Sequence, residues 1–337
     1  MIDTTPERNL ALDLARVTEA AAMAAARHQG RGDKEAVDQA AVDAMRSILD
    51  TIDMDGVVVI GEGEKDSAPM LFNGERVGNG NLPAMDVAVD PVDGTRLTAM
   101  GGPGALAVMA LAERGTMYAP GALVYMDKIA VGEEAKGSID LDAPVGENLK
   151  RIARALDKDL EDLTAIILDR PRNAPHIAEA RAAGVRIRII PDGDISAAIA
   201  TAFPDSGIDV LLGIGGSPEA VIAACALRCI GGEMLCRLWP RDDAERAYAK
   251  EAGLDLTQIL DIKSLVNGED VFFAATGVTD GELLDGVRYI PDGARTHTVV
   301  MRAKTGTVRF MEATHRFDRL SQITSAYDGV IPPSQAS

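Results

Sequence analysis

Carboxylates directly follow several of the predicted strands of this chain. They are Glu62 after residues 56–60, Asp90 and Asp93 after residues 85–89, and Glu219 after residues 209–212. In sheets that alternate with helices, ligand sites gather outside the carboxyl ends of the strands. Carboxylates that converge there repel one another unless divalent cations neutralise them. Because all these candidate ligands are oxygens, the sequence favours Mg²⁺ or Mn²⁺ over zinc or copper.

The segment 90–95, Asp-Pro-Val-Asp-Gly-Thr, carries the strongest indication of such a site. Pro91 favours an extended backbone at Asp90, so the strand presents that carboxylate at its end. Gly94 lets a backbone N–H approach a ligand closely, and Thr95 is expected to cap the next helix, whose first N–H groups suit a phosphate. The alternative is an ordinary Asp-Pro turn with a tight Asp-Gly bend. Together with the other strand-end carboxylates, the segment favours a metal and phosphate site.

Two glycine-flanked charged segments add further candidates. In residues 61–65, the glycines free the backbone around Glu62, for which we expect a ligand role, and Glu64 is a weaker candidate beside it. A solvated turn is the alternative. In residues 30–34, Asp33 is explained as a helix cap. Asp38 borders the apolar stripe of that helix, where a metal would relieve the cost of burying its charge.

The loop 213–219, Gly-Ile-Gly-Gly-Ser-Pro-Glu, lacks the Lys-Ser/Thr of a P-loop and the spacing of a dinucleotide fingerprint. We expect Ser217 to be the N-cap of a helix and Pro218 to occupy its first position. Glu219 then falls in the first turn, where capping alone would favour an acid. The glycines give an independent reason to expect a ligand close to the backbone.

Two other loops are suited to hold a phosphorylated sugar. The loop Arg170-Pro171-Arg172 offers two guanidinium groups, which suit a phosphate. The loop Asp192-Gly193-Asp194 offers carboxylates for sugar hydroxyls. Each is also compatible with a plain polar turn.

Apolar periodicity predicts the elements that must position these residues. Helices are expected over residues 6–28, 33–52, 147–156, 174–183, 195–202 and 218–229, and strands over 56–60, 85–89, 105–111, 122–125, 163–168, 185–190, 209–212 and 271–275. The alternation in the second half predicts a mainly parallel sheet with helices on its faces. We expect two domains, a metal- and phosphate-binding domain over 1–160 and a sugar-binding domain over 161–337.

Composition excludes several functions. The net charge of −18, from 34 Lys+Arg against 52 Asp+Glu, argues against nucleic-acid binding. No run approaches the ~18 apolar residues that a membrane span needs. Residues 1–15 lack a signal-peptide core and the three cysteines are expected to be reduced core thiols, so we predict a cytoplasmic protein. No histidine or cysteine spacing indicates a zinc site.

Several segments, in order, resemble class II fructose-1,6-bisphosphatase. They are Gly-Arg-Gly-Asp-Lys (30–34), Ile-Gly-Glu-Gly-Glu (60–64), Val-Asp-Pro-Val-Asp-Gly-Thr (89–95), Tyr-Met-Asp-Lys (125–128), Pro-Arg (171–172), Pro-Asp-Gly-Asp (191–194) and Gly-Ile-Gly-Gly-Ser-Pro-Glu (213–219). The resemblance covers nearly the whole chain. The Asp-Pro-x-Asp-Gly-Thr segment alone is shared with the wider lithium-sensitive phosphomonoesterases, and the other segments narrow the match to class II.

The resemblance implies an α/β sugar-phosphatase fold with layers in the order α-β-α-β-α. It implies hydrolysis of the 1-phosphate of fructose 1,6-bisphosphate to fructose 6-phosphate, in gluconeogenesis, with two or more Mn²⁺ or Mg²⁺ ions at the site. It also implies a homo-oligomer, either a dimer or a tetramer. The only other partner expected is the sugar bisphosphate itself.

The resemblance also assigns residues position by position. The metal ligands would be Asp38, Glu62, Asp90, Asp93 and Glu219. The substrate contacts would be Asp93, Gly94, Thr95, Tyr125, Arg170, Pro171, Arg172, Asp192, Gly193, Asp194 and Gly216. Members of the family often carry Lys at the position of Arg170 and Glu at that of Asp93.

The catalytic residues expected from this hypothesis are Thr95, Lys34 and Glu64. Thr95 would orient the attacking water, and either Asp38 or Glu64 would accept its proton. Lys34 would steady the transferring phosphoryl group. Two alternatives stay open: an enzyme that also accepts sedoheptulose 1,7-bisphosphate, and a sugar-phosphate-binding protein without catalytic activity.

Overall fold

The computed structural model describes residues 9–63, 70–323, 327 and 330–331. The helices are α1 (Ala11–Ala26), α2 (Lys34–Leu49), α3 (Thr95–Met100), α4 (Val145–Ala155), α5 (Ala174–Ala183), α6 (Asp194–Ala200), α7 (Ser217–Ile230), α8 (Asp243–Glu251), α9 (Ile262–Leu265) and α10 (Phe317–Ile323). The strands are β1 (Asp55–Ile60), β2 (Arg76–Val77), β3 (Ala84–Asp93), β4 (Leu106–Glu113), β5 (Tyr125–Val131), β6 (Thr164–Leu168), β7 (Arg186–Ile190), β8 (Val210–Gly216), β9 (Glu233–Leu238), β10 (Leu260–Asp261), β11 (Phe272–Gly277), β12 (Arg288–Ile290), β13 (Gly293–Arg302) and β14 (Thr307–Arg316).

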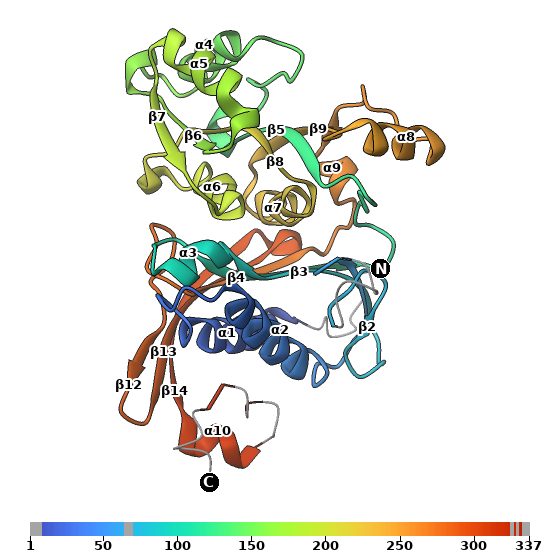
Figure 1. The fold of residues 1–337 in the computed structure, drawn as a ribbon, viewed down its shortest axis with the longest axis vertical. Helices are drawn as coiled ribbons and strands as arrows, with labels where there is room; N and C mark the ends of the chain where they lie inside the picture. The colour runs from blue at the N-terminus through green and yellow to red at the C-terminus, as the bar shows by residue number, and fades with distance from the viewer. Residues whose placement is uncertain (1–8, 64–69, 324–326, 328–329, 332–337) are drawn as a thin grey trace, which may run out of the picture.

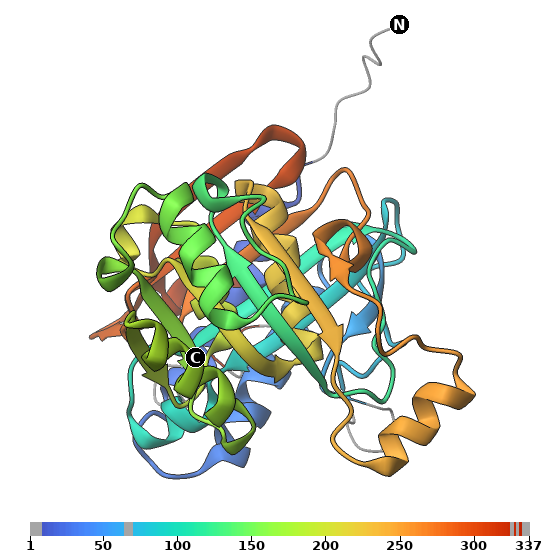
Figure 2. The ribbon, with the colours of Figure 1, turned by 90° about the horizontal axis from the view of Figure 1, so that it is seen from above.

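The elements stack in five layers, α-β-α-β-α, as expected (Figure 1). Helices α1 and α2 cover one face of the first sheet, α6 and α7 lie between the two sheets, and α4 and α5 cover the outer face of the second. Seen from above, the second sheet lies over the first and α8 projects at the side (Figure 2). Three apolar cores fill the interfaces between the layers, and the middle core covers both faces of the central helices, because every sheet or helix face must be covered.

Both sheets are mixed, which corrects the expectation of a mainly parallel sheet. The first has the order β12-β13-β11-β4-β3-β1-β2, with β14 paired to β13, and the second has the order β10-β9-β5-β8-β6-β7. In the second sheet β6 runs parallel to β7 and β8, whereas β5 is antiparallel to β8 and β9. Whether two strands pair parallel or antiparallel depends on how the chain connects them, and apolar periodicity carries no information on these connections.

The expected helices and strands are found with shifted ends. The helix expected over 174–183 ends where predicted, whereas residues 122–124 precede β5 instead of belonging to it. The expected helix start at residues 6–8 lies outside the described residues. The division into domains at residue 160 stays a prediction; the chain itself enters the second sheet at β5 and returns to the first at β11.

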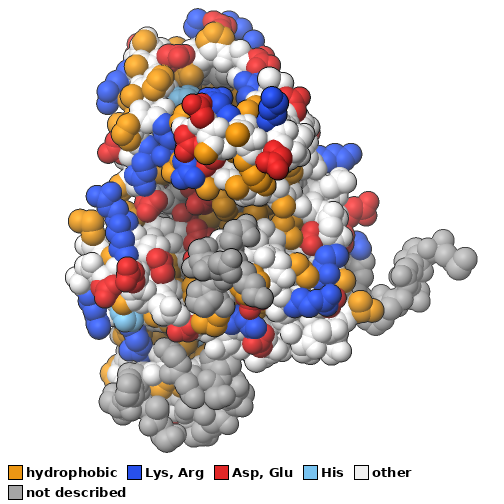
Figure 3. Space-filling model, turned by 45° about the vertical axis from the view of Figure 1, so that its right-hand side comes forward, with side chains coloured by type: hydrophobic (Ala, Val, Ile, Leu, Met, Phe, Trp, Pro, Cys, Tyr) orange, Lys and Arg blue, Asp and Glu red, His pale blue; other side chains and the backbone are white. Residues whose placement is uncertain are grey.

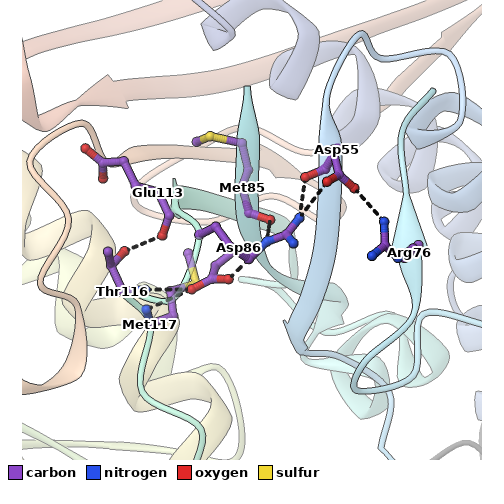
Figure 4. Close-up of polar contacts among 8 residues, drawn as sticks. Asp55, Arg76, Met85, Asp86, Glu113, Thr116 and Met117 are labelled. Carbon is purple, nitrogen blue, oxygen red and sulfur yellow. Dashed lines mark hydrogen bonds and ion pairs between the residues drawn. The ribbon is translucent and has the colours of Figure 1, made fainter. Parts of the chain in front are cut away.

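A buried acid fixes the turn that follows β4 of the first sheet. Asp86 on β3 is 2% exposed, and its Oδ2 accepts hydrogen bonds from the backbone N–H groups of Thr116 and Met117 at 2.8 and 3.1 Å. Arg114 joins the group by donating to the Met85 carbonyl and by facing Asp55 (Figure 4). Because these bonds satisfy the buried carboxylate, the turn after β4 leads the chain to the second sheet in a fixed direction.

No helix within the described ranges combines the length and apolar character needed to cross a bilayer. The three cysteines are buried free thiols, as expected for core residues.

Candidate active site

Carboxylates from both halves of the chain meet between the two sheets. A hollow of about 290 Å³ is lined by Glu62 after β1, by Asp90, Asp93 and Thr95 at the end of β3 and the start of α3, by Asp192, and by Glu219 of α7. In Figure 3 acidic side chains gather in a recess between the upper and lower parts of the molecule. The structure therefore brings Glu62, Asp90, Asp93 and Glu219 together, as the strand-end rule predicts, and their role as ligands stays a prediction.

The end of β3 is bulged, and the bulge directs its two acids. Asp90 pairs with Val108 of β4 and Asp93 with Leu106, so β3 carries one residue more than its partner over this stretch. The extra residue turns the strand, and Asp90 Oδ1 accepts a hydrogen bond from Val92 N at 3.1 Å. Gly94 then has a φ of 96°, a backbone conformation that residues with a side chain rarely adopt.

Gly94, and not Thr95, is the N-cap of α3, which corrects the expectation of a threonine cap. Thr95 stands one position later, inside the helix. Its hydroxyl donates to Asp38 Oδ1 of α2 at 2.6 Å and lies 3.1 Å from the Val92 carbonyl. The hydroxyl thus links α2 to the strand end instead of satisfying the helix N–H groups.

The closeness of the acids raises their pKa values. Burial, and then the charges of Asp93, Glu219 and Glu62, raise the pKa of Asp90 well above its usual range. Burial and the neighbouring acids, Asp194 first, do the same for the pKa of Asp93. Burial raises the pKa of Glu219 to about 7, with the Asp194 charge adding to it.

Glu62 and Asp38, at the rim of the hollow, interact electrostatically with the same cluster of acids. Glu62 opens to solvent, yet desolvation by the surrounding chain, and then the charge of Asp38, raise its pKa to about 7. Burial likewise raises the pKa of half-buried Asp38, against the hydrogen bond from Thr95 and the charge of Lys34. Raised pKa values mean that the ionised carboxylates are destabilised in this site. The binding of a cation would therefore stabilise them.

The donor set suits a hard divalent cation. Asp93 Oδ2 and Glu219 Oε2 are buried and have no hydrogen-bond partner within the part of the chain that the structure describes, and such atoms are costly unless a ligand satisfies them. Among the described residues, no three His, Cys, Asp or Glu side chains lie close enough to hold an ion by themselves. A cation here would complete its shell with other oxygens, as Mg²⁺ commonly does with water and phosphate.

The start of α7 brings Glu219 into the hollow. Gly216 is the N-cap and Ser217 the first helical residue, which corrects the expected capping role of Ser217. The Ser217 hydroxyl instead donates to the Leu123 carbonyl at 2.5 Å. A Cβ on Gly216 would overlap the Glu219 carboxylate, which folds back over that residue. The glycine is therefore required by a close approach and not by its φ of −63°.

A second hollow, of about 310 Å³, adjoins the first and shares Asp192, Pro218 and Glu219 with it. It adds Tyr125, Arg170, Arg172, Asp194 and Gly216 to its lining. The guanidinium of Arg172 lies 3.9 Å from the centre of the Tyr125 ring, and its Nε donates to the Ile214 carbonyl at 3.0 Å. Arg170 donates to the Pro191 carbonyl at 2.6 Å and faces Asp192 at 3.6 Å. The second hollow therefore differs from the first in having two arginines beside its acids.

Some predicted residues stand at the margin. Lys34 is exposed, within electrostatic reach of Asp38 and Asp192. Pro171 is exposed in a 3₁₀ turn, and Gly193 is the N-cap of α6 with a φ of 89°. Glu64 lies outside the described residues.

Sequence reasoning missed two buried polar residues behind the site. Asn173 donates to the carbonyls of Leu168 and Ile214 and accepts from Ile214 N at 2.7 Å, which fixes the end of β8. Lys128 of β5 is 2% exposed and lies 2.5 Å from Asp194. Burial would lower the pKa of Lys128, but the charges of Asp194 and Glu219 outweigh it and raise that pKa. The signal for Lys128 was its place beside Asp127 in the segment 126–131, whose other residues are all apolar.

A five-layer α/β fold that sets an acidic hollow beside one with two arginines fits the class of the phosphoric monoester hydrolases. The profile of the bacterial, glpX-encoded fructose-1,6-bisphosphatases matches residues 8–315. The chain is 45% identical over 326 residues to fructose-1,6-bisphosphatase 1 class 2 of Escherichia coli K12, covering 93% of this chain and 96% of that protein. Class 2 fructose-1,6-bisphosphatases of Escherichia coli O6:H1 and Shigella flexneri match over the same lengths with the same identity. The chain belongs to this family of fructose-bisphosphate hydrolases.

Proposed function

We propose that the two adjoining hollows hold the two phosphates of fructose 1,6-bisphosphate. The 1-phosphate enters the acidic hollow and is released, which leaves fructose 6-phosphate. The 6-phosphate lies against Arg170 and Arg172. The observation that carries this assignment is that the hollows share Asp192 and Glu219 but differ in charge.

Divalent cations, Mn²⁺ or Mg²⁺, bind at the acidic hollow and supply positive charge to the phosphate oxygens and to the attacking water. Their ligands are Asp38, Glu62, Asp90, Asp93 and Glu219. The unpartnered buried oxygens of Asp93 and Glu219 support this set, as do burial and neighbouring acidic charges, which raise the pKa values of Asp90 and Glu219. More than one cation is expected, because so many carboxylates share so small a volume.

Thr95 and Asp38 act as a pair on the attacking water. The Thr95 hydroxyl already donates to Asp38 at 2.6 Å, so its oxygen lone pairs are free to accept a hydrogen bond from water. When that water attacks phosphorus, its proton passes toward Asp38 through this bond. This contact favours Asp38 over Glu64 as the proton acceptor.

On the sugar side, Asp192 and Asp194 accept hydrogen bonds from hydroxyls, while Tyr125 holds Arg172 in place by stacking. The energy of binding the 6-phosphate positions the reacting end of the sugar. Truncated substrates without the 6-phosphate are therefore expected to lose turnover as well as affinity.

The test is phosphate release from fructose 1,6-bisphosphate, sedoheptulose 1,7-bisphosphate and an inositol monophosphate, each with Mn²⁺ and with a chelator. We expect Mn²⁺-dependent release from the first sugar and none from inositol monophosphate. Product analysis should show fructose 6-phosphate. Release unaffected by the chelator, or fructose 1-phosphate as the product, would contradict the proposal.

A further inference from the structure

A lysine is buried among the acids of the sugar-binding loop. Of the residues that the structure describes, Lys128 is the one lysine in the buried class. Its Nζ lies 2.5 Å from Asp194 Oδ2 and donates to the Gly216 carbonyl at 3.1 Å. Those two partners lie on different elements, the start of α6 and the end of β8.

The chain makes room for this lysine. A Cβ on Gly215 would overlap the Asp194 carboxylate and lie 2.6 Å from Lys128 Cε. Gly215 has no positive φ, so its backbone alone does not require a glycine. The absence of a side chain at residue 215 is explained by the ion pair that occupies its place.

Resting on the function proposed above, we propose that Lys128 is a positioning residue for sugar binding, which fixes Asp194 and the Gly216 carbonyl and keeps Asp194 out of the metal-binding set. Asp194 lies within electrostatic reach of Asp93 and Glu219. With one oxygen held by Lys128, Asp194 presents only its other oxygen to the substrate. Without the lysine, Asp194 would be free to turn toward a cation.

Loss of Lys128 should therefore weaken the binding of the sugar without weakening the binding of the metal. The sugar loses an oriented acceptor, so KM for fructose 1,6-bisphosphate rises. The acidic hollow loses a positive charge and gains a mobile carboxylate, so Mn²⁺ binds at least as tightly as before. A lysine that only supported the fold would, on removal, weaken both together.

The variants are Lys128→Met and Gly215→Ala, the second of which displaces the ion pair without removing either charge. Lys136→Met is the matched control, because Lys136 is an exposed lysine beyond the far end of β5. Steady-state kinetics are measured on fructose 1,6-bisphosphate, Mn²⁺ binding by electron paramagnetic resonance without substrate, and folding by thermal melts.

We expect KM to rise at least tenfold in both variants, with Mn²⁺ affinity unchanged or higher in Lys128→Met and no effect in the control. In an Asp194→Asn background, Lys128→Met should add less than a twofold further rise in KM. A wild-type KM in Lys128→Met, or weakened Mn²⁺ binding there, would overturn the inference. A wild-type protein without Mn²⁺-dependent hydrolysis would instead overturn the proposed function, whatever the variants do.

Discussion

At the scale of the residue, the site depends on groups that are individually unfavourable. Asp93 and Glu219 each bury an oxygen that has no partner among the residues described, and both have raised pKa values. A fold retains such unfavourable groups when the binding of a ligand offsets their cost in free energy. Thr95 and Asp38 differ from these two acids, because the hydrogen bond between them gives each side chain a partner within the protein.

Thr95→Ala tests that contact. We expect kcat to fall by about 10²- to 10⁴-fold, the range for loss of general acid–base assistance, with KM within a few-fold of wild type. The hydroxyl acts on the water and not on the sugar, so steady-state kinetics separate the two effects. Thr95→Ser keeps the hydroxyl and should retain most of the activity. A change confined to KM in the alanine variant would contradict the role of Thr95.

At the scale of the element, strand ends and helix starts act together. The bulge at the end of β3 presents Asp90 and Asp93, while the first turn of α7 presents Glu219 over Gly216. Neither element alone forms the hollow, because its walls come from opposite sheets. A glycine permits each arrangement, Gly94 through its positive φ and Gly216 by leaving room for Glu219.

Gly216→Ala should weaken metal binding by displacing Glu219. The added methyl group overlaps that carboxylate, so we expect the Mn²⁺ dissociation constant to rise about tenfold, equivalent to ~1.4 kcal/mol. Gly146→Ala, in α4, is the control, since a Cβ there meets no atom within 4 Å. Equal Mn²⁺ affinity in the two variants, measured by titration, would show that Glu219 does not depend on this glycine.

At the scale of the whole molecule, α1 is attached to the first sheet through buried polar groups. Thr18 contacts Thr276, which contacts Thr298, at 2.8 and 2.9 Å. Beside them, burial raises the pKa of Glu19 to about 7, against hydrogen bonds with Thr296 and Thr298 and the charge of Arg16. His315 lies 3.9 Å from Glu19, and burial lowers the pKa of this histidine.

Glu19 gives the stability a pH dependence. Because its folded pKa exceeds its unfolded value of 4.5, the folded state holds the proton more tightly between about pH 4.5 and pH 7. The free energy of unfolding therefore falls as pH rises through that window, by up to about 3 kcal/mol. In Glu19→Gln this contribution is absent.

Urea unfolding of both proteins at pH 5.5 and pH 8 checks this expectation. Both proteins contain His315, so its contribution cancels when the free energy of unfolding of one protein is subtracted from that of the other at each pH. The variant should gain stability relative to wild type at the higher pH. A difference that is the same at both pH values would contradict the raised pKa of Glu19.

Much of the site could be predicted from sequence, because strand-end carboxylates follow a rule of topology. That rule brought Glu62, Asp90 and Glu219 together without knowledge of strand direction. Apolar periodicity could not distinguish parallel from antiparallel pairing. The contact of Lys128 with Asp194 joins residues 66 positions apart, and no local pattern encodes it. The caps were misassigned because Gly94 is required by its φ of 96° and Gly216 by the close approach of Glu219, and neither caps through a side chain.

The most direct measurement is Mn²⁺ binding together with phosphate release in Asp90→Asn. Burial, and then the charges of Asp93, Glu219 and Glu62, raise the pKa of Asp90, so this acid lies among the other carboxylates of the cluster. We expect the variant to keep the wild-type fold by circular dichroism, bind Mn²⁺ at least tenfold more weakly and lose phosphate release from fructose 1,6-bisphosphate. Wild-type release from a folded Asp90→Asn protein would contradict the claim that these carboxylates gather to hold cations for hydrolysis.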